Sequence, residues 1–166
     1  MRRIVKLMED WQFTYQGRKK RLIDLPHTWN AVDGQDGNDD YFRGTCVYEK
    51  KIPMPEFSDE ERVYLQFQGV NASAKVILNG ITILTHDNGY STFRTDVTDV
   101  LKEMNELRVE VDNSKNQEVY PQVADFTFYG GIYRDVEFLI VHKTHFDLDY
   151  YGGPGLQVST NVKGKT

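Results

Sequence analysis

The run ADFTFYGGIYRDV, residues 124–136, places an acid ahead of three aromatic residues and a Gly-Gly pair. The carboxylate of Asp125 can accept several hydrogen bonds and can hold two adjacent hydroxyl groups. The glycines lack a Cβ, so the backbone can turn sharply and can approach another domain closely. Arg134 and Asp135 are expected to form an ion pair that fixes this loop. The run is typical of a turn that feeds a strand, and Asp125 is a candidate ligand-binding residue.

Aromatic side chains are frequent in and beside the predicted loops. Sugars are bound by stacking their C–H faces on aromatic rings, while neighbouring acids and amides accept hydrogen bonds from the hydroxyl groups. The alternative interpretation is that the rings cap the end of the core, and we expect this of at least half of them. The loop aromatics are Trp29, Tyr41, Phe42, Tyr120, Phe126, Phe128 and Tyr129.

The other reactive residue types form no catalytic or metal-binding pattern. The acidic loop DGQDGNDDYF, residues 33–42, has no register with Gly at the sixth and Glu at the twelfth position of a calcium loop. The four histidines accompany no Gly-x-Ser-x-Gly motif, and a structural role is expected for each. Cys46, the single cysteine, is expected to be buried and inert. The sequence therefore predicts no catalytic residue, no metal site and no cofactor in this chain.

Composition excludes several classes of partner. The net charge of -5 and the absence of a basic stripe argue against nucleic-acid binding. No apolar run approaches the roughly 20 residues that a membrane span requires. The N-terminal run MRRIVKLMEDW is too polar for a secretory signal, so a cytoplasmic protein is expected, or a periplasmic or secreted one if a signal has been removed.

Period-two alternation of apolar residues dominates the chain and predicts many short strands. Asn79-Gly80 separates two alternating runs and predicts a hairpin, and the basic cluster GRKKRL at residues 17–22 predicts another turn. Helix is expected only as a turn or two at residues 95–104. The predicted fold is an all-β antiparallel sandwich with very little helix. The clearest alternating runs are WQFTY (11–15), RVYLQFQGV (62–70), ELRVEV (106–111) and RDVEFLIV (134–141).

A domain boundary is expected near residue 143. The last alternating run ends at Val141 and is followed by a polar stretch that contains GGPG at residues 152–155. LQVSTNV, residues 156–162, has the pattern of a strand with no partner after it. We therefore expect one domain at residues 1–143 and, at 144–166, a linker or the truncated start of a second domain.

Four collinear stretches together resemble the N-terminal, sugar-binding jelly-roll domain of glycoside hydrolase family 2, most closely its β-galactosidases. Other family members with this sandwich act on β-glucuronides or β-mannosides. The resemblance spans residues 11–141, and the tail is similar to the start of that family's immunoglobulin-like second domain. The four stretches are LIDLPHTWN (22–30), DYFRGTCVYEKKI (40–52), residues 64–102 and ADFTFYGGIYRDVEFLI (124–140).

The resemblance implies a supporting role for this chain in hydrolysing β-galactosides. In the family both catalytic glutamates lie on a later TIM-barrel domain, so the chain alone is expected to be inactive and to have its own downstream domains as partners. The acid ahead of Gly-Gly-Ile-Tyr-Arg hydrogen-bonds the sugar there, which corresponds to Asp125 here. A second sugar contact would come from Asn38, Asp39 or Asp40, where the loop departs from the family pattern. The alternatives are a free-standing carbohydrate-binding module and a purely structural sandwich.

Overall fold

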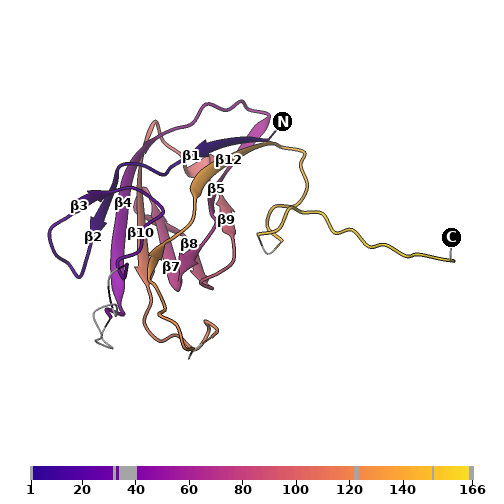
Figure 1. Ribbon diagram of the computed structural model, residues 1–166. Helices are drawn as coiled ribbons and strands as arrows, with labels where there is room; N and C mark the ends of the chain where they lie inside the picture. The colour runs from indigo at the N-terminus through magenta and orange to yellow at the C-terminus, as the bar shows by residue number, and fades with distance from the viewer. Residues whose placement is uncertain (1, 32, 34–40, 122–123, 151, 165–166) are drawn as a thin grey trace.

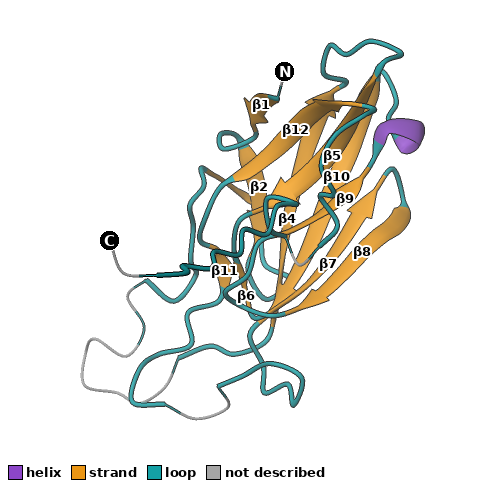
Figure 2. Cartoon of the chain, turned by 90° about the vertical axis from the view of Figure 1, so that its right-hand side faces the viewer, coloured by secondary structure: helices purple, strands orange, loops and turns teal. Residues whose placement is uncertain are grey.

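Two antiparallel β-sheets packed face to face make up the body of the protein (Figures 1 and 2). The computed structural model describes residues 2–31, 33, 41–121, 124–150 and 152–164. Among these residues, helix is limited to one 3-10 turn, η1 (Thr98–Val100). The predicted all-β antiparallel sandwich with very little helix is therefore confirmed.

The strands form a smaller sheet, a larger sheet and one short extra pair. In spatial order, the four-stranded sheet contains β1 (Arg3–Lys6), β12 (Val136–His142), β5 (Glu61–Phe67) and β9 (Phe93–Asp96). The six-stranded sheet contains β3 (Arg21–Ile23), β2 (Trp11–Thr14), β4 (Thr45–Pro53), β10 (Met104–Asp112), β7 (Ser73–Leu78) and β8 (Ile81–Asp87). The short pair, which ties the loop after β10 to the connection between β5 and β7, is β11 (Gly131–Ile132) with β6 (Val70–Asn71).

The core lies between the two sheets and is built from alternate residues of the strands. In β10 the buried apolar side chains are Leu107, Val109 and Val111, as their spacing predicts. Burying one side chain of this kind stabilises the fold by about 1.5–3 kcal/mol, so the alternation decides which face of each strand turns inward. Cys46 is also buried, and burial raises the pKa of its thiol to about 11, as expected for an inert thiol. The largest fully buried aromatic side chains are Trp11, Tyr48, Phe13, Phe67 and Phe138.

Both predicted hairpins are present. Asn79 and Gly80 have φ angles of 53° and 84° and join β7 to β8, which is the backbone that a two-residue hairpin turn needs. The basic cluster at residues 17–22 begins in the turn between β2 and β3, which pair antiparallel. The expected short helix is the η1 turn, where the Asp96 carboxylate accepts a hydrogen bond from the backbone N–H of Thr98 at 2.9 Å.

The ion pair expected between Arg134 and Asp135 does not form. The guanidinium of Arg134 lies over the ring of Tyr133, 5.2 Å from its centroid. Asp135 instead pairs with Lys6, whose Nζ lies 2.5 Å from the Asp135 carboxylate and 2.6 Å from that of Glu137. Because neighbouring residues at the start of a strand point to opposite faces, a cation on the adjacent strand β1 reaches Asp135 more directly than Arg134 does.

His27 has the structural role that the sequence predicts. Its Nδ1 lies 2.7 Å from the Tyr48 hydroxyl, and its Nε2 lies 3.2 Å from a guanidinium nitrogen of Arg21. Because a guanidinium can only donate, Nε2 must accept and therefore carries no proton. Burial, together with the charge of Arg21, lowers the pKa of His27 to about 4.

The stability of the domain should therefore depend on pH through His27. In the unfolded chain the imidazole binds a proton below about pH 6.5, whereas in the folded protein it does so only near pH 4. The unfolded state thus binds more protons in this window, and the free energy of unfolding should fall as the pH is lowered from about 7 to about 5. Urea denaturation of the native chain and of His27→Gln at both pH values checks this. The variant should show the smaller decrease, and equal decreases would refute the assignment.

Candidate functional site

The candidate site lies at the end of the sandwich where the loop after β10 meets the loop between β3 and β4 (Figure 1). Asp125 is on the first of these loops and is exposed. Within the described part of the chain its carboxylate takes part in no hydrogen bond or ion pair. An exposed acid without a structural partner is available to a ligand, whereas an acid that shapes a turn would be bonded to nearby N–H groups.

Asn30 joins the two loops from the inside. Its side chain is wholly buried, and its Oδ1 accepts hydrogen bonds from the backbone N–H of Gly130 at 2.8 Å and from Nδ2 of Asn113 at 3.2 Å. Its Nδ2 donates to the Asp33 carboxylate at 2.7 Å and to the carbonyl of Phe42 at 2.9 Å. Every hydrogen-bonding position of this buried amide is used, which is the condition under which a buried polar group stabilises a fold.

Asn113, at the end of β10, completes the same network. Its Nδ2 also donates to the carbonyl of Phe128 at 3.0 Å, and its Oδ1 accepts from the backbone N–H of Gly44 at 2.9 Å. Its side chain is wholly buried. Asn71 adds a third anchor, because its Nδ2 donates to the carbonyl of Tyr129 at 2.8 Å. Buried asparagines therefore hold the backbone at residues 128–130, a few residues after Asp125.

Gly130 and Gly131 are needed for the close contact between this loop and the strand exit near His27. A Cβ on Gly130 would run into the indole of Trp29. Gly131 has a φ of 140°, and a Cβ there would collide with the backbone carbonyl of His27. The sequence suggested a close approach to another domain, whereas the structure shows these glycines in close contact within this domain. The contact lets Trp29 close the end of the core.

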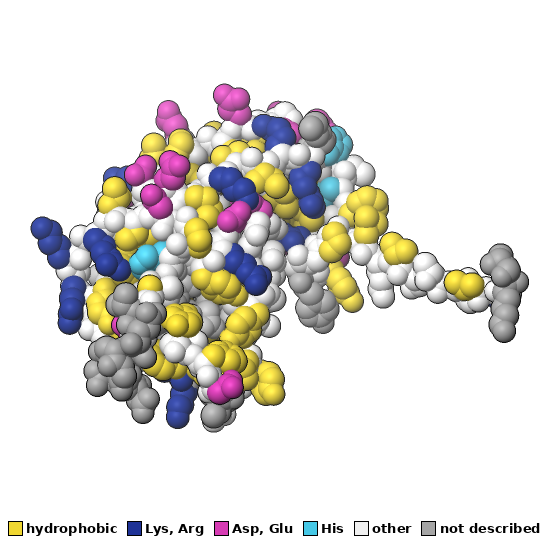
Figure 3. Space-filling view, viewed as in Figure 1, with side chains coloured by type: hydrophobic (Ala, Val, Ile, Leu, Met, Phe, Trp, Pro, Cys, Tyr) yellow, Lys and Arg dark blue, Asp and Glu magenta, His cyan; other side chains and the backbone are white. Residues whose placement is uncertain are grey.

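The seven loop aromatics differ in burial. Trp29 is buried and Phe42 packs against the core, so these two cap the sandwich, which is fewer than the half expected. Tyr41 and Phe128 are half-buried. The rings of Tyr120, Phe126 and Tyr129 are 87%, 52% and 41% exposed. Exposed apolar side chains lie at this end of the molecule in Figure 3. Asp125 is therefore flanked by apolar surface that could contact a sugar ring or another domain.

The remaining predicted contacts lie outside the described residues. Asn38, Asp39 and Asp40 belong to the range 34–40, so their predicted role stays a prediction. No group of three or more His, Cys, Asp or Glu side chains suited to a metal ion occurs in the part of the chain that the structure describes. What the described residues offer is a hydrogen-bond acceptor beside aromatic surface, which can bind a polyhydroxylated ligand.

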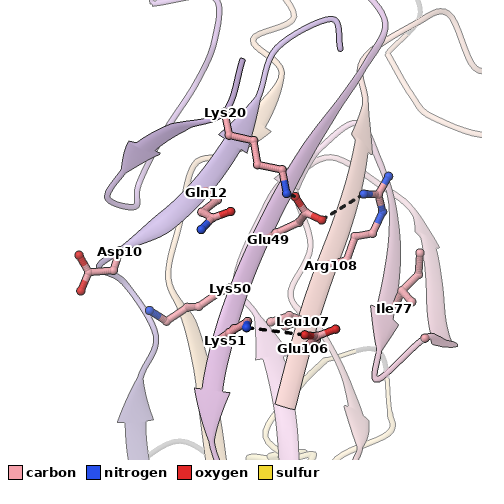
Figure 4. A pocket seen from close by; sticks show the side chains of 11 residues that line it. Asp10, Gln12, Lys20, Glu49, Lys50, Lys51, Ile77, Glu106, Leu107 and Arg108 are labelled. Carbon is pink, nitrogen blue, oxygen red and sulfur yellow. Dashed lines mark hydrogen bonds and ion pairs between the residues drawn. The ribbon is translucent and has the colours of Figure 1, made fainter. Parts of the chain in front are cut away.

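A second concave surface lies on the outer face of the six-stranded sheet (Figure 4) and has a volume of about 530 Å³. It is lined by ion-paired residues rather than by rings. Glu49 lies 2.5 Å from Lys20 Nζ and 3.3 Å from Arg108, and the hydrogen bond from Lys20 lowers the pKa of the Glu49 carboxyl. No aromatic side chain lines it. Lys50 donates to the backbone carbonyl of Glu9, and Lys51 lies 3.9 Å from Glu106. Because most of these charged side chains have partners, we interpret the surface as a solvated sheet face.

The two packed sheets, together with the end of the sandwich where the two loops meet, define a galactose-binding-like β-sandwich. The sequence matches the family model described as glycosyl hydrolase 2 galactose-binding domain-like over residues 35–156. The chain therefore belongs to glycoside hydrolase family 2 as its galactose-binding-like domain. No helix in the described ranges has the length and hydropathy to cross a lipid bilayer.

The proteins similar to this chain are named either as β-glucuronidases or as β-galactosidases. A β-glucuronidase of Bacteroides fragilis is 40% identical over 97% of this chain and 24% of its own length. A β-galactosidase of Thermoanaerobacter pseudethanolicus is 28% identical over 96% of this chain and 23% of its own. The structure of an FMN-binding β-glucuronidase from Faecalibacterium prausnitzii L2-6 superposes with a TM-score of 0.88 at 46% identity, covering 93% of this chain and 25% of that one. This chain thus spans about a quarter of the length of these relatives.

The buried asparagine network is a consequence of the fold that sequence patterns missed. The sequence features that could have indicated this network were Asn30, at the end of the LPHTWN run, and Asn113, directly after an alternating run. Both positions suit an exposed turn asparagine equally well, because these residues favour turns. Only the meeting of the two loops buries them.

Replacing Asn113 by Ala should destabilise the domain. The change leaves the part-buried N–H of Gly44 and carbonyl of Phe128 without this partner, which costs about 1–3 kcal/mol for each group that water does not reach. Urea denaturation followed by tryptophan fluorescence measures the loss. Asn161→Ala, in the exposed tail, is the matched control and should change the free energy of unfolding by less than about 0.5 kcal/mol. Equal stability of the two variants would show that the network does not hold the loops.

Proposed function

We propose that this chain is the non-catalytic N-terminal domain of a multidomain family 2 β-glycosidase, and that Asp125 hydrogen-bonds the sugar at the non-reducing end of the substrate. One observation carries the proposal. Asp125 is exposed and unpaired among the described residues, on a loop whose following backbone is held by buried asparagines. A carboxylate held in this way can accept hydrogen bonds from two neighbouring hydroxyl groups without reorganising the loop.

The chemistry of bond cleavage belongs to other parts of the longer enzyme in this proposal. Family resemblance assigns the acid/base and nucleophile glutamates to a TIM barrel. The exposed rings of Tyr120, Phe126 and Tyr129 would then meet that barrel or the substrate. Asp125 would add binding energy at one edge of the site and would take no part in proton transfer.

For the substrate, we favour a β-glucuronide, with a β-galactoside as the second candidate. The support for the first is the 40% and 46% identities to proteins named β-glucuronidases, one of them by structure. The support for the second is the structure of a putative β-galactosidase from Bacteroides fragilis, which superposes with a TM-score of 0.85 at 31% identity. Asp125 suits either sugar, because both present hydroxyl groups.

The concave sheet face offers no aromatic ring on which a free-standing carbohydrate-binding module could stack a sugar. Modules of that kind commonly stack sugars on rings exposed on a sheet face or at a loop end. The concave surface in Figure 4 has no aromatic lining, and Glu49, Lys20 and Arg108 on it are ion-paired. The exposed rings lie at the loop end instead, where a second domain would also meet them.

Hydrolysis assays with the longer protein test the proposal directly. Of the 4-nitrophenyl β-glucuronide, β-galactoside, β-mannoside and β-glucoside, the glucuronide should be cleaved with the highest kcat/KM. The isolated chain, assayed in parallel, should cleave none of them and should show no heat of binding in calorimetry with glucuronate or galactose at low-millimolar concentration. Micromolar sugar binding by the isolated chain would support the binding-module alternative, and no turnover of any substrate by the longer protein would refute the proposal.

Substitution of Asp125 separates a ligand contact from a turn acid. In the longer protein Asp125→Ala should lower kcat/KM by roughly 10–1000-fold, equivalent to about 1.4–4 kcal/mol of lost transition-state stabilisation. The free energy of unfolding of the isolated domain should be nearly unchanged, because the carboxylate has no described intramolecular partner. Glu103 is an exposed acid directly before β10, at the opposite end of that strand from the loop, so Glu103→Ala is the matched control and should leave both quantities unchanged. If Asp125→Ala unfolds the isolated domain, the carboxylate is structural and the assignment fails.

A further inference from the structure

The outer face of the four-stranded sheet is covered by chain that follows the last strand. Tyr64 on β5 and Leu139 and Val141 on β12 point away from the core between the sheets, yet all three are buried. They form a second apolar cluster with Leu148, which is 1% exposed. We name residues 144–150 and 152–155 the strap; residue 151 lies outside the described residues. Figure 1 shows the chain after β12 turning back beside β9 before it extends away.

The strap is anchored at its first turn by His145 and in its middle by Leu148. The imidazole of His145 lies edge-on to the ring of Tyr64, with 5.6 Å between ring centroids, and its Nε2 is 3.2 Å from the Tyr64 hydroxyl. Its Nδ1 lies 2.7 Å from the carbonyl oxygen of His142. Because a carbonyl oxygen can only accept a hydrogen bond, Nδ1 carries the proton and donates it. Nε2 therefore accepts the hydrogen bond from the Tyr64 hydroxyl.

Arg94 on β9 fastens the far end of the strap. Its Nη1 donates to the backbone carbonyls of Leu148 at 2.8 Å and of Gly153 at 2.9 Å. Its Nη2 donates to the carbonyl of Gly152. One guanidinium thus holds three carbonyls of a segment that has no strand or helix hydrogen bonds of its own, and hydrogen bonds from a charged donor are the stronger kind.

Two glycines give the strap the path that this contact requires. Gly152 has a φ of 66°, and a Cβ there would collide with the backbone carbonyl of Thr92, next to β9. Gly155 has a φ of 76°, and a Cβ there would collide with the carbonyl of Asp147 within the strap itself. The GGPG run is therefore suited to one particular fold-back against the sheet, whereas an unstructured linker would place no such demand on its glycines.

We propose that the strap is a built part of this domain and that Arg94 is the positioning residue that fixes it, so the chain leaves the sandwich after residue 155 in a set direction. The outer face of β5 and β12 is then an intramolecular docking surface whose occupant is the strap, residues 144–150 and 152–155. The family match extends to residue 156, past β12 and through the whole strap. The inference does not depend on the proposed enzymatic function, because it rests on contacts within this chain.

Hydrogen–deuterium exchange and limited proteolysis of the 166-residue chain test the proposal. In the native chain, peptides covering residues 144–155 should exchange more slowly than those covering 156–166, and trypsin should cut after Lys163 well before it cuts after Lys143. In Arg94→Ala the strap peptides should exchange at least about tenfold faster, and cleavage after Lys143 should accelerate similarly, while β4 and β10 keep their protection.

Further variants separate release of the strap from unfolding. Gly152→Ala alters only the strap, after the last strand, and should release it in the same way. Arg94→Lys, which keeps the charge but cannot reach three carbonyls, should give an intermediate rate, and Arg108→Ala on the other sheet should leave the strap protected. Rapid exchange of the strap in the native chain would overturn the proposal, as would unchanged exchange and unchanged cleavage after Lys143 in both Arg94→Ala and Gly152→Ala.

Discussion

The need to satisfy buried amide groups governs the end of this sandwich. Asn30 and Asn113 are wholly buried where two long loops cross, and each of them bonds to backbone on the other loop. Because an unpaired polar group in the interior is costly, the buried positions of these two side chains and the conformations of the enclosing loops depend on each other. The exposed loop that carries Asp125 thus begins beside a rigid support, which is what a ligand contact on a loop requires.

The two sheets have different tasks in this arrangement. The six-stranded sheet turns an ion-paired face to solvent, and its strands β4 and β10 deliver Gly44 and Asn113 to the loop end. The four-stranded sheet is buried on both faces at β5 and β12, because the strap lies on its outer side. The domain therefore has three layers along part of its width, and the strap is the third.

Much of the fold could be predicted from local patterns, and the rest depends on contacts between distant residues. Alternation and Asn79-Gly80 predicted the strands and the β7–β8 hairpin because they reflect local backbone geometry and one-sided burial. The same alternation could not reveal that Leu139 and Val141 are buried under the strap, since their partner lies beyond the predicted boundary near residue 143. The partner of Asp135, on a strand more than a hundred residues away, was beyond reach for the same reason.

The candidate site was predictable only in part. The sequence motif and the family resemblance pointed to Asp125, and the structure adds that this acid is exposed and free of described partners. Residues 34–40, with Asn38 and Asp39, stay a prediction. Local sequence could not identify the asparagines that support the loop, because an asparagine beside a turn is more often exposed than buried.

The most direct test of the account is a structure of the longer protein with a glycoside or a glycosidic inhibitor bound. The account predicts a carboxylate oxygen of Asp125 at hydrogen-bond distance, about 2.6–3.2 Å, from a hydroxyl of the sugar at the non-reducing end. A sugar bound in the active site with Asp125 turned to solvent, or bonded only to the protein, would contradict it.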